Sequence, residues 1–262
     1  MSSDLLVVGL SRMAYGETLA LQRTLAEARI DGRVTNDMLL LVEHPPVVTL
    51  GRSFEKKNLR TPPEELAARG IELFEIERGG DVTFHGPGQL VGYPIYDLNE
   101  HKPDLHLFLR QIEECLIRTL GESGVAGRRR EGLTGVWVED RKIASIGIHV
   151  KKWITWHGFA LNVLTDLSFF HLIVPCGIDE VVMTSMQREL AEQAPHDLWA
   201  RALDGVMLAF CEVFDQTPQA VTVEDIQYRI LNIRYSIFKC LLPHQFKEPS
   251  EHLHTLPKLL HR

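Results

Sequence analysis

Cys176 is the residue of this sequence best suited to covalent chemistry. It follows the apolar run Phe169–Val174 and lies between Pro175 and Gly177, which predicts a turn that presents the sulfur to a pocket. A cysteine thiolate is a strong nucleophile, whereas a cysteine within a core element acts only as a small apolar side chain. The core interpretation suits the helical surroundings of Cys115 and Cys211, and Cys240 carries no signal.

Lys142 is a candidate proton carrier. Strand alternation over residues 141–148 places it on one face with Ala144, Ile146 and Ile148. The side chain then either extends past the strand end to solvent or is removed from water. Lysines have an ordinary pKa near 10.4, and burial lowers it, so a desolvated lysine exchanges protons near neutral pH.

A glycine-rich segment, Arg78–Leu90, brings backbone close to some other group. It reads Arg-Gly-Gly-Asp-Val-Thr-Phe-His-Gly-Pro-Gly-Gln-Leu and holds four glycines between Gly79 and Gly88. Backbone N–H groups in such a loop bind a carbonyl or a phosphate, although a tight hairpin would have similar composition. Neither the P-loop nor the dinucleotide-binding glycine pattern is present. The embedded Arg78 and His85 favour a functional loop.

The remaining polar signals are weaker. His85 and His157 each precede a glycine, which suggests loops or tight packing, and we expect most of the other ten histidines to be solvated. Their spacing predicts no metal site. Thr184 and Gln187 fit a capping box at the start of a helical run to Ala194, where free N–H groups also suit an anion.

The composition is that of an ordinary globular protein. The 262 residues are 45% apolar and 24% charged, and a net charge of −7 gives no basic field for nucleic acid. The N-terminal residues resemble neither a secretory signal nor a transit peptide, and no window is long and apolar enough for a membrane span. Without a C-x-x-C pair, the cysteines predict free thiols in a reducing, cytoplasmic setting.

Hydrophobic periodicity predicts strands in the middle of the chain with helices around them. Helices are expected at Ala14–Ile30, Pro63–Arg69, Asp104–Leu120, His196–Phe214 and, more weakly, Val223–Ile233, and strands at Met38–Val42, Val47–Leu50, Ile71–Ile76 and Trp153–Val163. Gly135–Ile148 predicts a hairpin that turns at Glu139–Asp140. The pattern decays after Tyr235. We therefore expect an α/β or α+β fold, with residues 1–222 as one domain and residues 223–262 as an extension of uncertain role.

Several of these segments, taken in order, resemble the lipoyl(octanoyl) transferases. The resemblance rests on the glycine-rich segment, on Lys142–Gly147, on His157–Gly158 with Ala160–Asn162, and on Ile173–Gly177. It implies a mixed sheet flanked by helices, similar to the catalytic domains of biotin and lipoate protein ligases, and a catalytic pair formed by Lys142 and Cys176. It also implies that substrate is bound by Arg78, Gly79, Gly80, Thr83, His85, Gly86, Gly88, Gln89, Ser145, Ile146, Gly147, His157, Gly158, Asn162 and Gly177.

The resemblance further implies octanoyl transfer, the first step of lipoate attachment. The donor would be octanoyl-acyl carrier protein, and the acceptors would be lysines of lipoyl domains in 2-oxoacid dehydrogenases and of the glycine-cleavage H protein. No cofactor, metal, nucleic acid or membrane is expected to take part. The acyl group would form a thioester on Cys176, with Lys142 moving the proton. N–H groups around Cys176 and Gly177, or in the loop from Gly79 to Gly88, are candidates to stabilise the oxyanion.

Other functions stay open at this point. An ATP-dependent lipoate or biotin ligase of the same fold would not need Cys176. A non-catalytic protein that binds lipoyl domains or acyl carriers would form no acyl-cysteine, and a hydrolase with His85 or His157 as base would release free acid. An acidic carrier would need a basic island, for which the sequence offers Lys56-Lys57 with Arg60, Arg128–Arg130, and Lys151-Lys152.

Overall fold

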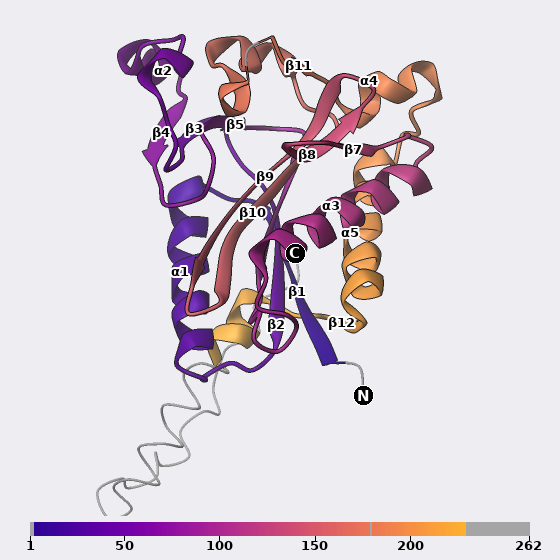
Figure 1. Ribbon diagram of the computed structural model, residues 1–262. Coiled ribbons are helices and arrows are strands. Elements are labelled where there is room, and N and C mark those ends of the chain that lie inside the picture. The colour runs from indigo at the N-terminus through magenta and orange to yellow at the C-terminus, as the bar shows by residue number, and fades with distance from the viewer. Residues whose placement is uncertain (1–2, 179, 229–262) are drawn as a thin grey trace, which may run out of the picture.

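The structure, a computed structural model, describes residues 3–178 and 180–228 (Figure 1). Its centre is a nine-stranded mixed sheet in which β12-β1-β2-β6-β10-β9-β8-β7 are neighbours and β11 also pairs with β9. In that order the strands span Gln216–Ala220, Ser3–Arg12, Asp37–Glu43, Gln89–Ile95, Ile154–Asn162, Arg141–Lys151, Leu133–Val138 and Arg128–Arg130, and β11 spans Val182–Met183. β1 runs parallel to β12 and β2, and β11 runs parallel to β9. The mixed sheet confirms the predicted fold class.

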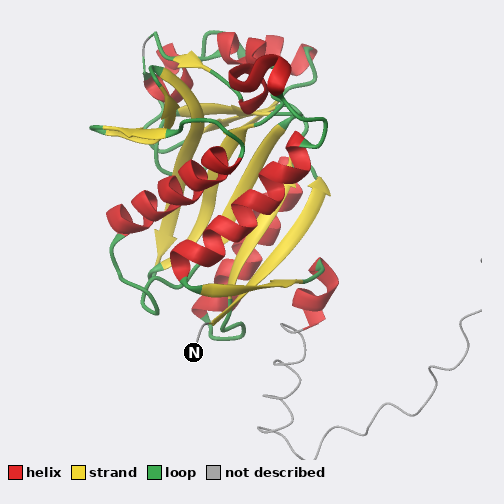
Figure 2. Cartoon of the chain, turned by 90° about the vertical axis from the view of Figure 1, so that its right-hand side faces the viewer, coloured by secondary structure: helices red, strands yellow, loops and turns green. Residues whose placement is uncertain are grey.

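The two faces of this sheet are both covered, as the unbroken apolar run in β2 predicts. Leu39 and Leu41 pack with helices α3 (Leu105–Glu122) and α5 (Leu198–Phe214). Met38 and Leu40 point the other way and pack with α1 (Tyr15–Ile30). Figure 2 shows α3 and α5 lying across the sheet. β9 and β10, which carry the predicted catalytic motifs, are therefore fixed between two cores.

A second sheet of three strands carries the glycine-rich segment. Its order is β4-β3-β5, with bounds Glu72–Glu75, Val47–Leu50 and Val82–His85. Helix α2 (Pro63–Ala68) contributes the buried Leu66 to the core beneath this sheet. The 3-10 segment η1 (Lys56–Asn58) lies between β3 and α2, and η2 (Leu167–Leu172) and η3 (Pro175–Gly177) lie between β10 and β11, while η4 (Ala191–Gln193) follows helix α4 (Met186–Leu190).

Most of the predicted elements are found within a few residues of their expected bounds. The hairpin of β8 and β9 turns at Glu139–Asp140, as predicted. Thr184 is not the expected N-cap, because Ser185 accepts the hydrogen bond from the Arg188 N–H and α4 ends at Leu190. Residues 223–228 are helical, and the rest of the predicted helix, with Cys240, lies outside the described residues. None of the described helices has the length and apolar composition to cross a membrane.

Candidate active site

Cys176 lies at the tip of a tight turn. It is the middle residue of η3, and its φ of 58° is in the left-handed region, which costs a non-glycine residue about 1–3 kcal/mol. Two contacts position the turn from outside: the Val174 N–H donates to the Asn58 carbonyl over 2.7 Å, and the Asn58 amide donates to Asp81. The turn is thus held by Asn58 of the 3-10 segment η1, and Asn58 is in turn held by Asp81, the residue before β5.

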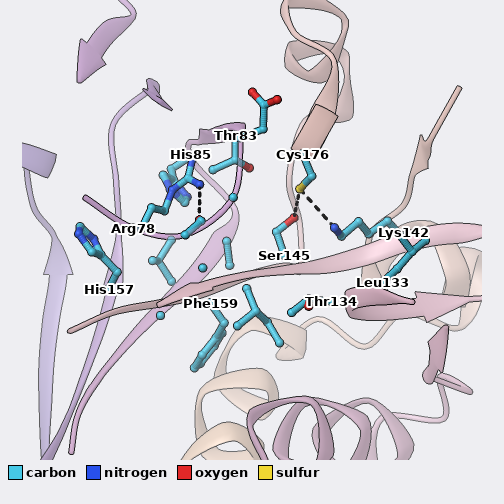
Figure 3. A pocket seen from close by; sticks show the side chains of 18 of the residues that line it. Arg78, Thr83, His85, Leu133, Thr134, Lys142, Ser145, His157, Phe159 and Cys176 are labelled. Atoms are coloured by element: carbon cyan, nitrogen blue, oxygen red, sulfur yellow. Dashed lines mark hydrogen bonds between the residues drawn. The ribbon is translucent and has the colours of Figure 1, made fainter. Parts of the chain in front are cut away.

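The side chains of β9 converge on the Cys176 sulfur. Lys142 Nζ donates to Sγ over 3.2 Å, and Ser145 Oγ lies 3.6 Å from the same atom (Figure 3). Lys142 is only 1% exposed, so the strand-end lysine reaching solvent is the wrong interpretation. Its ammonium lies 5.4 Å from the centroid of the Trp137 ring, where the π face favours a cation.

The surroundings of Cys176 favour the thiolate. Burial alone raises the pKa of the thiol, but several opposing effects outweigh it and the pKa lies below the ordinary value. These are the positive charge of Lys142, the hydrogen bonds from Ser145 and Lys142, and the charge of Arg78. Cys176 is therefore prepared to act as a nucleophile. The described residues contain no cluster of His, Cys, Asp and Glu side chains suited to a metal ion.

Arg78 organises the glycine-rich loop. The side chain is buried, and its Nη2 donates to the Thr49 carbonyl over 2.8 Å while Nη1 donates to the Gly79 carbonyl over 3.0 Å. Burial lowers the pKa of Arg78. The Gly79 N–H in turn donates to the Ile148 carbonyl over 3.0 Å, which joins the loop to β9. Arg78 thus contributes position and positive charge to the site.

A cavity of about 220 Å³ connects Cys176 with the glycine-rich loop. Twelve of the seventeen predicted site residues line it: Arg78, Gly79, Gly80, Thr83, His85, Lys142, Ser145, Ile146, Gly147, His157, Gly158 and Cys176. His157 pairs with Ile148, three residues along β9 from Ser145, so this part of the cavity extends for about 10 Å. Phe159, Val91 and Ala160 give the cavity an apolar side.

Gln89 and Asn162 lie outside the cavity lining and orient His85 instead. The Gln89 amide donates to the Phe84 carbonyl and to Asn162 Oδ1, so Gln89 Oε1 accepts from His85 Nδ1 over 2.8 Å. Asn162 in turn donates to the Thr184 carbonyl over 2.9 Å. His85 therefore carries its proton on Nδ1, and burial lowers its pKa to about 3. A neutral imidazole lines the cavity.

The glycines Gly86, Gly88 and Gly177 also lie outside the lining. Gly88 N–H donates to Glu43 Oε1 over 2.7 Å, and Gly177 N–H donates to the Val174 carbonyl over 3.0 Å. A Cβ on Gly88 would come within 2.6 Å of the Leu164 backbone. These N–H groups, like that of Gly79, are occupied in the structure. The expected oxyanion donors among them thus have partners before any substrate binds.

Sequence patterns did not indicate several residues of the site. Tyr15, Asp81 and Tyr93 line the cavity, and Trp137 packs against the Lys142 ammonium. His44, expected to be solvated, is fully buried: Nδ1 donates to the Met13 carbonyl and Nε2 accepts from the Tyr93 hydroxyl, each over 2.8 Å. Its only local signal was the His44-Pro45-Pro46 break between two strands.

The chain is similar to known proteins over most of its length. Residues 14–206 match the lipoyl protein ligase A/B catalytic domain family. The octanoyltransferase of Koribacter versatilis (strain Ellin345) is 52% identical over 191 residues, which cover 71% of this chain and 76% of that protein. The octanoyltransferase of Synechococcus elongatus is 46% identical over 213 residues, which cover 81% and 88%.

Solved structures support the fold. A lipoate-protein ligase A bound with ATP has a TM-score of 0.66 at 17% identity, covering 91% of this chain and 95% of its own. The bi-partite lipoate protein ligase from Thermoplasma acidophilum has a TM-score of 0.64 at 18% identity, covering 91% and 92%. With a family match over most of its length and relatives near 50% identity, the chain belongs to the lipoyl protein ligase A/B catalytic domain family, as an acyltransferase that transfers octanoyl groups in lipoate attachment.

Proposed function

We propose that this enzyme carries the octanoyl group as a thioester on Cys176. The donor is octanoyl-acyl carrier protein, and the acceptors are lysines of lipoyl domains and of the glycine-cleavage H protein. The observation that carries the proposal is the 3.2 Å contact between Lys142 Nζ and Cys176 Sγ at the end of a partly apolar cavity. The expected cytoplasmic location is part of the proposal, because a reducing compartment keeps the thiol free.

The first half-reaction forms the acyl-enzyme. The Cys176 thiolate attacks the thioester carbonyl, and the carbonyl oxygen of the tetrahedral intermediate takes the negative charge. When the intermediate collapses, the carbon–sulfur bond to the carrier arm breaks, and the leaving thiolate takes a proton from the Lys142 ammonium. Lys142 ends this step neutral beside the new thioester.

The second half-reaction transfers the chain to the acceptor. The incoming lysine amine attacks the Cys176 thioester, an amide bond forms, and the carbon–sulfur bond breaks. The neutral Lys142 accepts the proton that the attacking amine loses, which restores the ammonium–thiolate pair. One residue thus gives a proton in the first step and regains it in the second, and no net proton is required from solvent.

The alternative functions fit the contacts less well. Among the described residues the polar partners of the Cys176 sulfur are Lys142 and Ser145, whereas a cysteine–histidine hydrolase would require a histidine there. An ATP-dependent ligase would need neither the lowered pKa of Cys176 nor the strained turn that presents it. The similarity to the ATP-bound ligase structure concerns the fold alone.

The intact mass of the protein tests this proposal after incubation with octanoyl-acyl carrier protein. We expect one octanoyl group on the wild type, its release on addition of a lipoyl domain, and no labelling of Cys176→Ser. Cys115→Ser is the matched control: Cys115 lies on α3, fully buried against α5, so this variant must leave labelling unchanged. Full transfer activity in Cys176→Ser would eliminate the covalent route.

A further inference from the structure

A second cavity lies against the other side of the catalytic turn. Its volume is about 390 Å³, and Pro175 and Ile178, which flank the Cys176 turn, are part of its wall. Ile178 also lines the catalytic cavity, so the two cavities adjoin at this turn. Apolar side chains of η2 and β11 also contribute to the wall, among them Leu167, Phe170 and Met183.

The wall of this second cavity is basic. Arg60, Arg188 and His171 contribute to it, with Glu180 as its acidic member. Within residues 3–178 and 180–228, no carboxylate lies within salt-bridge distance of either guanidinium, and both arginines are exposed. Guanidinium groups without a carboxylate partner suit a phosphate group, which they bind with two parallel hydrogen bonds.

The other cations of the basic islands pair with carboxylates or lie farther away. Arg129 binds Glu113 over 3.2 Å and Glu114 over 2.7 Å, and Lys57 binds Glu55 over 2.9 Å. Lys152 lies in the turn between β9 and β10, ten residues along the chain from Lys142 and about 30 Å away. Of the exposed cations in these islands, Arg60 is the one that lines a cavity beside the catalytic turn.

We propose that the second cavity binds the phosphate-bearing arm of the thioester donor, and this rests on the function proposed above. With the acyl chain in the catalytic cavity, the departing thiol requires a path on the other side of Cys176. A phosphopantetheine arm has the matching chemistry: a thiol end, an amide-containing chain suited to a partly apolar wall, and a phosphodiester for Arg60 and Arg188. We commit to the arm as carried by an acyl carrier protein.

Two small donors that differ only in the phosphate test the proposal. Octanoyl-phosphopantetheine and octanoyl-pantetheine are compared as substrates for acylation of Cys176 by the wild type and by the double variant Arg60→Ala, Arg188→Ala. We expect the wild type to favour the phosphorylated donor about tenfold or more in kcat/KM, through its KM. The double variant should lose that preference and keep the wild-type rate with octanoyl-pantetheine. Lys152→Ala is the control cation and should behave as the wild type.

The outcomes separate the two proposals. Equal use of both donors by the wild type would overturn the arm site while leaving acylation of Cys176 intact. An equal loss with both donors in the double variant would also overturn it, since the arginines would then act on the turn and not on phosphate. Failure of every donor to acylate Cys176 would overturn the proposed function itself. A higher wild-type kcat/KM for octanoyl-coenzyme A than for octanoyl-acyl carrier protein would contradict the commitment to a carrier protein.

Discussion

Lys142 Nζ lies 3.2 Å from Cys176 Sγ although only 1% of the lysine is exposed to solvent. A buried cation of this kind acts on the sulfur through its charge, through its proton, or through both. The charge alone accounts for part of the lowered pKa of the thiol. In the proposed mechanism, transfer of the proton serves both the leaving thiolate of the first step and the attacking amine of the second.

Lys142→Arg separates these two roles. Arginine retains the charge but does not give up a proton at these pH values, so we expect octanoyl transfer to fall about 10²–10⁴-fold. Alkylation of Cys176 by iodoacetamide should stay fast at neutral pH, because the thiolate still has a cation beside it. In Lys142→Met the alkylation profile should move to higher pH, since the charge that lowers the thiol pKa is gone. Full transfer by Lys142→Arg would reduce Lys142 to an electrostatic role.

Trp137 is expected to position Lys142. Its ring lies 5.4 Å from the ammonium, and Arg130 contacts the same ring at 5.1 Å. Among the described residues the buried indole N–H of Trp137 has no hydrogen-bond partner, so Trp137→Phe removes an unsatisfied donor while keeping an aromatic face. We expect Trp137→Phe to keep most activity. Trp137→Leu loses the π face and should shift the Cys176 alkylation midpoint to higher pH.

The shift of that midpoint is the deciding measurement for Trp137. A loss of packing alone would lower the melting temperature of Trp137→Leu without moving the pH profile of alkylation. Both variants are therefore compared with the wild type for melting temperature and for the pH dependence of the alkylation rate. Identical profiles in all three proteins would show that Trp137 only fills space.

The local patterns in the sequence predicted the long helices, several strands and the turn that carries Cys176, but not β1, β6 or β12. They did not predict how Lys142 reaches that turn. Strict alternation would place Lys142 and Ser145 on opposite faces of β9, yet both contact Cys176. The β8–β9 register shifts between Val136 and Trp137, and such an irregularity depends on tertiary packing.

The sequence did not predict the buried polar contacts of His44 either, because they also depend on tertiary packing. His44 contacts Met13 and Tyr93, which lie 31 and 49 residues away along the chain. A histidine beside two prolines carries no sign of such partners. The glycine-rich segment was easier to recognise from the sequence, because a cluster of glycines marks backbone that turns tightly or packs closely against another group. Even there, the sequence did not distinguish glycines that line the cavity from Gly88, which packs on another loop.

Gly88 and Gly79 should therefore respond differently to substitution. Gly88 has a φ of +78°, and an added Cβ would come within 2.6 Å of the Leu164 backbone. We expect Gly88→Ala to destabilise the fold by about 2 kcal/mol or more, a drop of roughly 4–8 °C in melting temperature. At Gly79 the nearest atom, the Ile148 carbonyl oxygen, would lie at 3.5 Å, so Gly79→Ala should melt close to the wild type. Equal melting temperatures would contradict the close packing at Gly88.

The buried histidines make stability depend on pH. Burial lowers the pKa of His44 to about 4 and that of His85 to about 3, from an unfolded value near 6.5. The unfolded chain therefore binds more protons than the folded one below pH 6.5. The stability from these neutral imidazoles is complete above pH 6.5 and is lost as the pH falls toward 4 and then 3.

His44→Gln tests this dependence. The lowered pKa of His44 corresponds to about 3 kcal/mol of stability between pH 6.5 and 4, and glutamine has no proton to gain there. We expect the variant to be less stable than the wild type at pH 7.5, because the contacts with Met13 and Tyr93 are altered, but to lose less stability on acidification. Urea unfolding midpoints from pH 4.5 to 7.5 measure both effects. The exposed His106 supplies the control, since His106→Gln should leave the wild-type slope unchanged, and a parallel slope in His44→Gln would contradict the assignment.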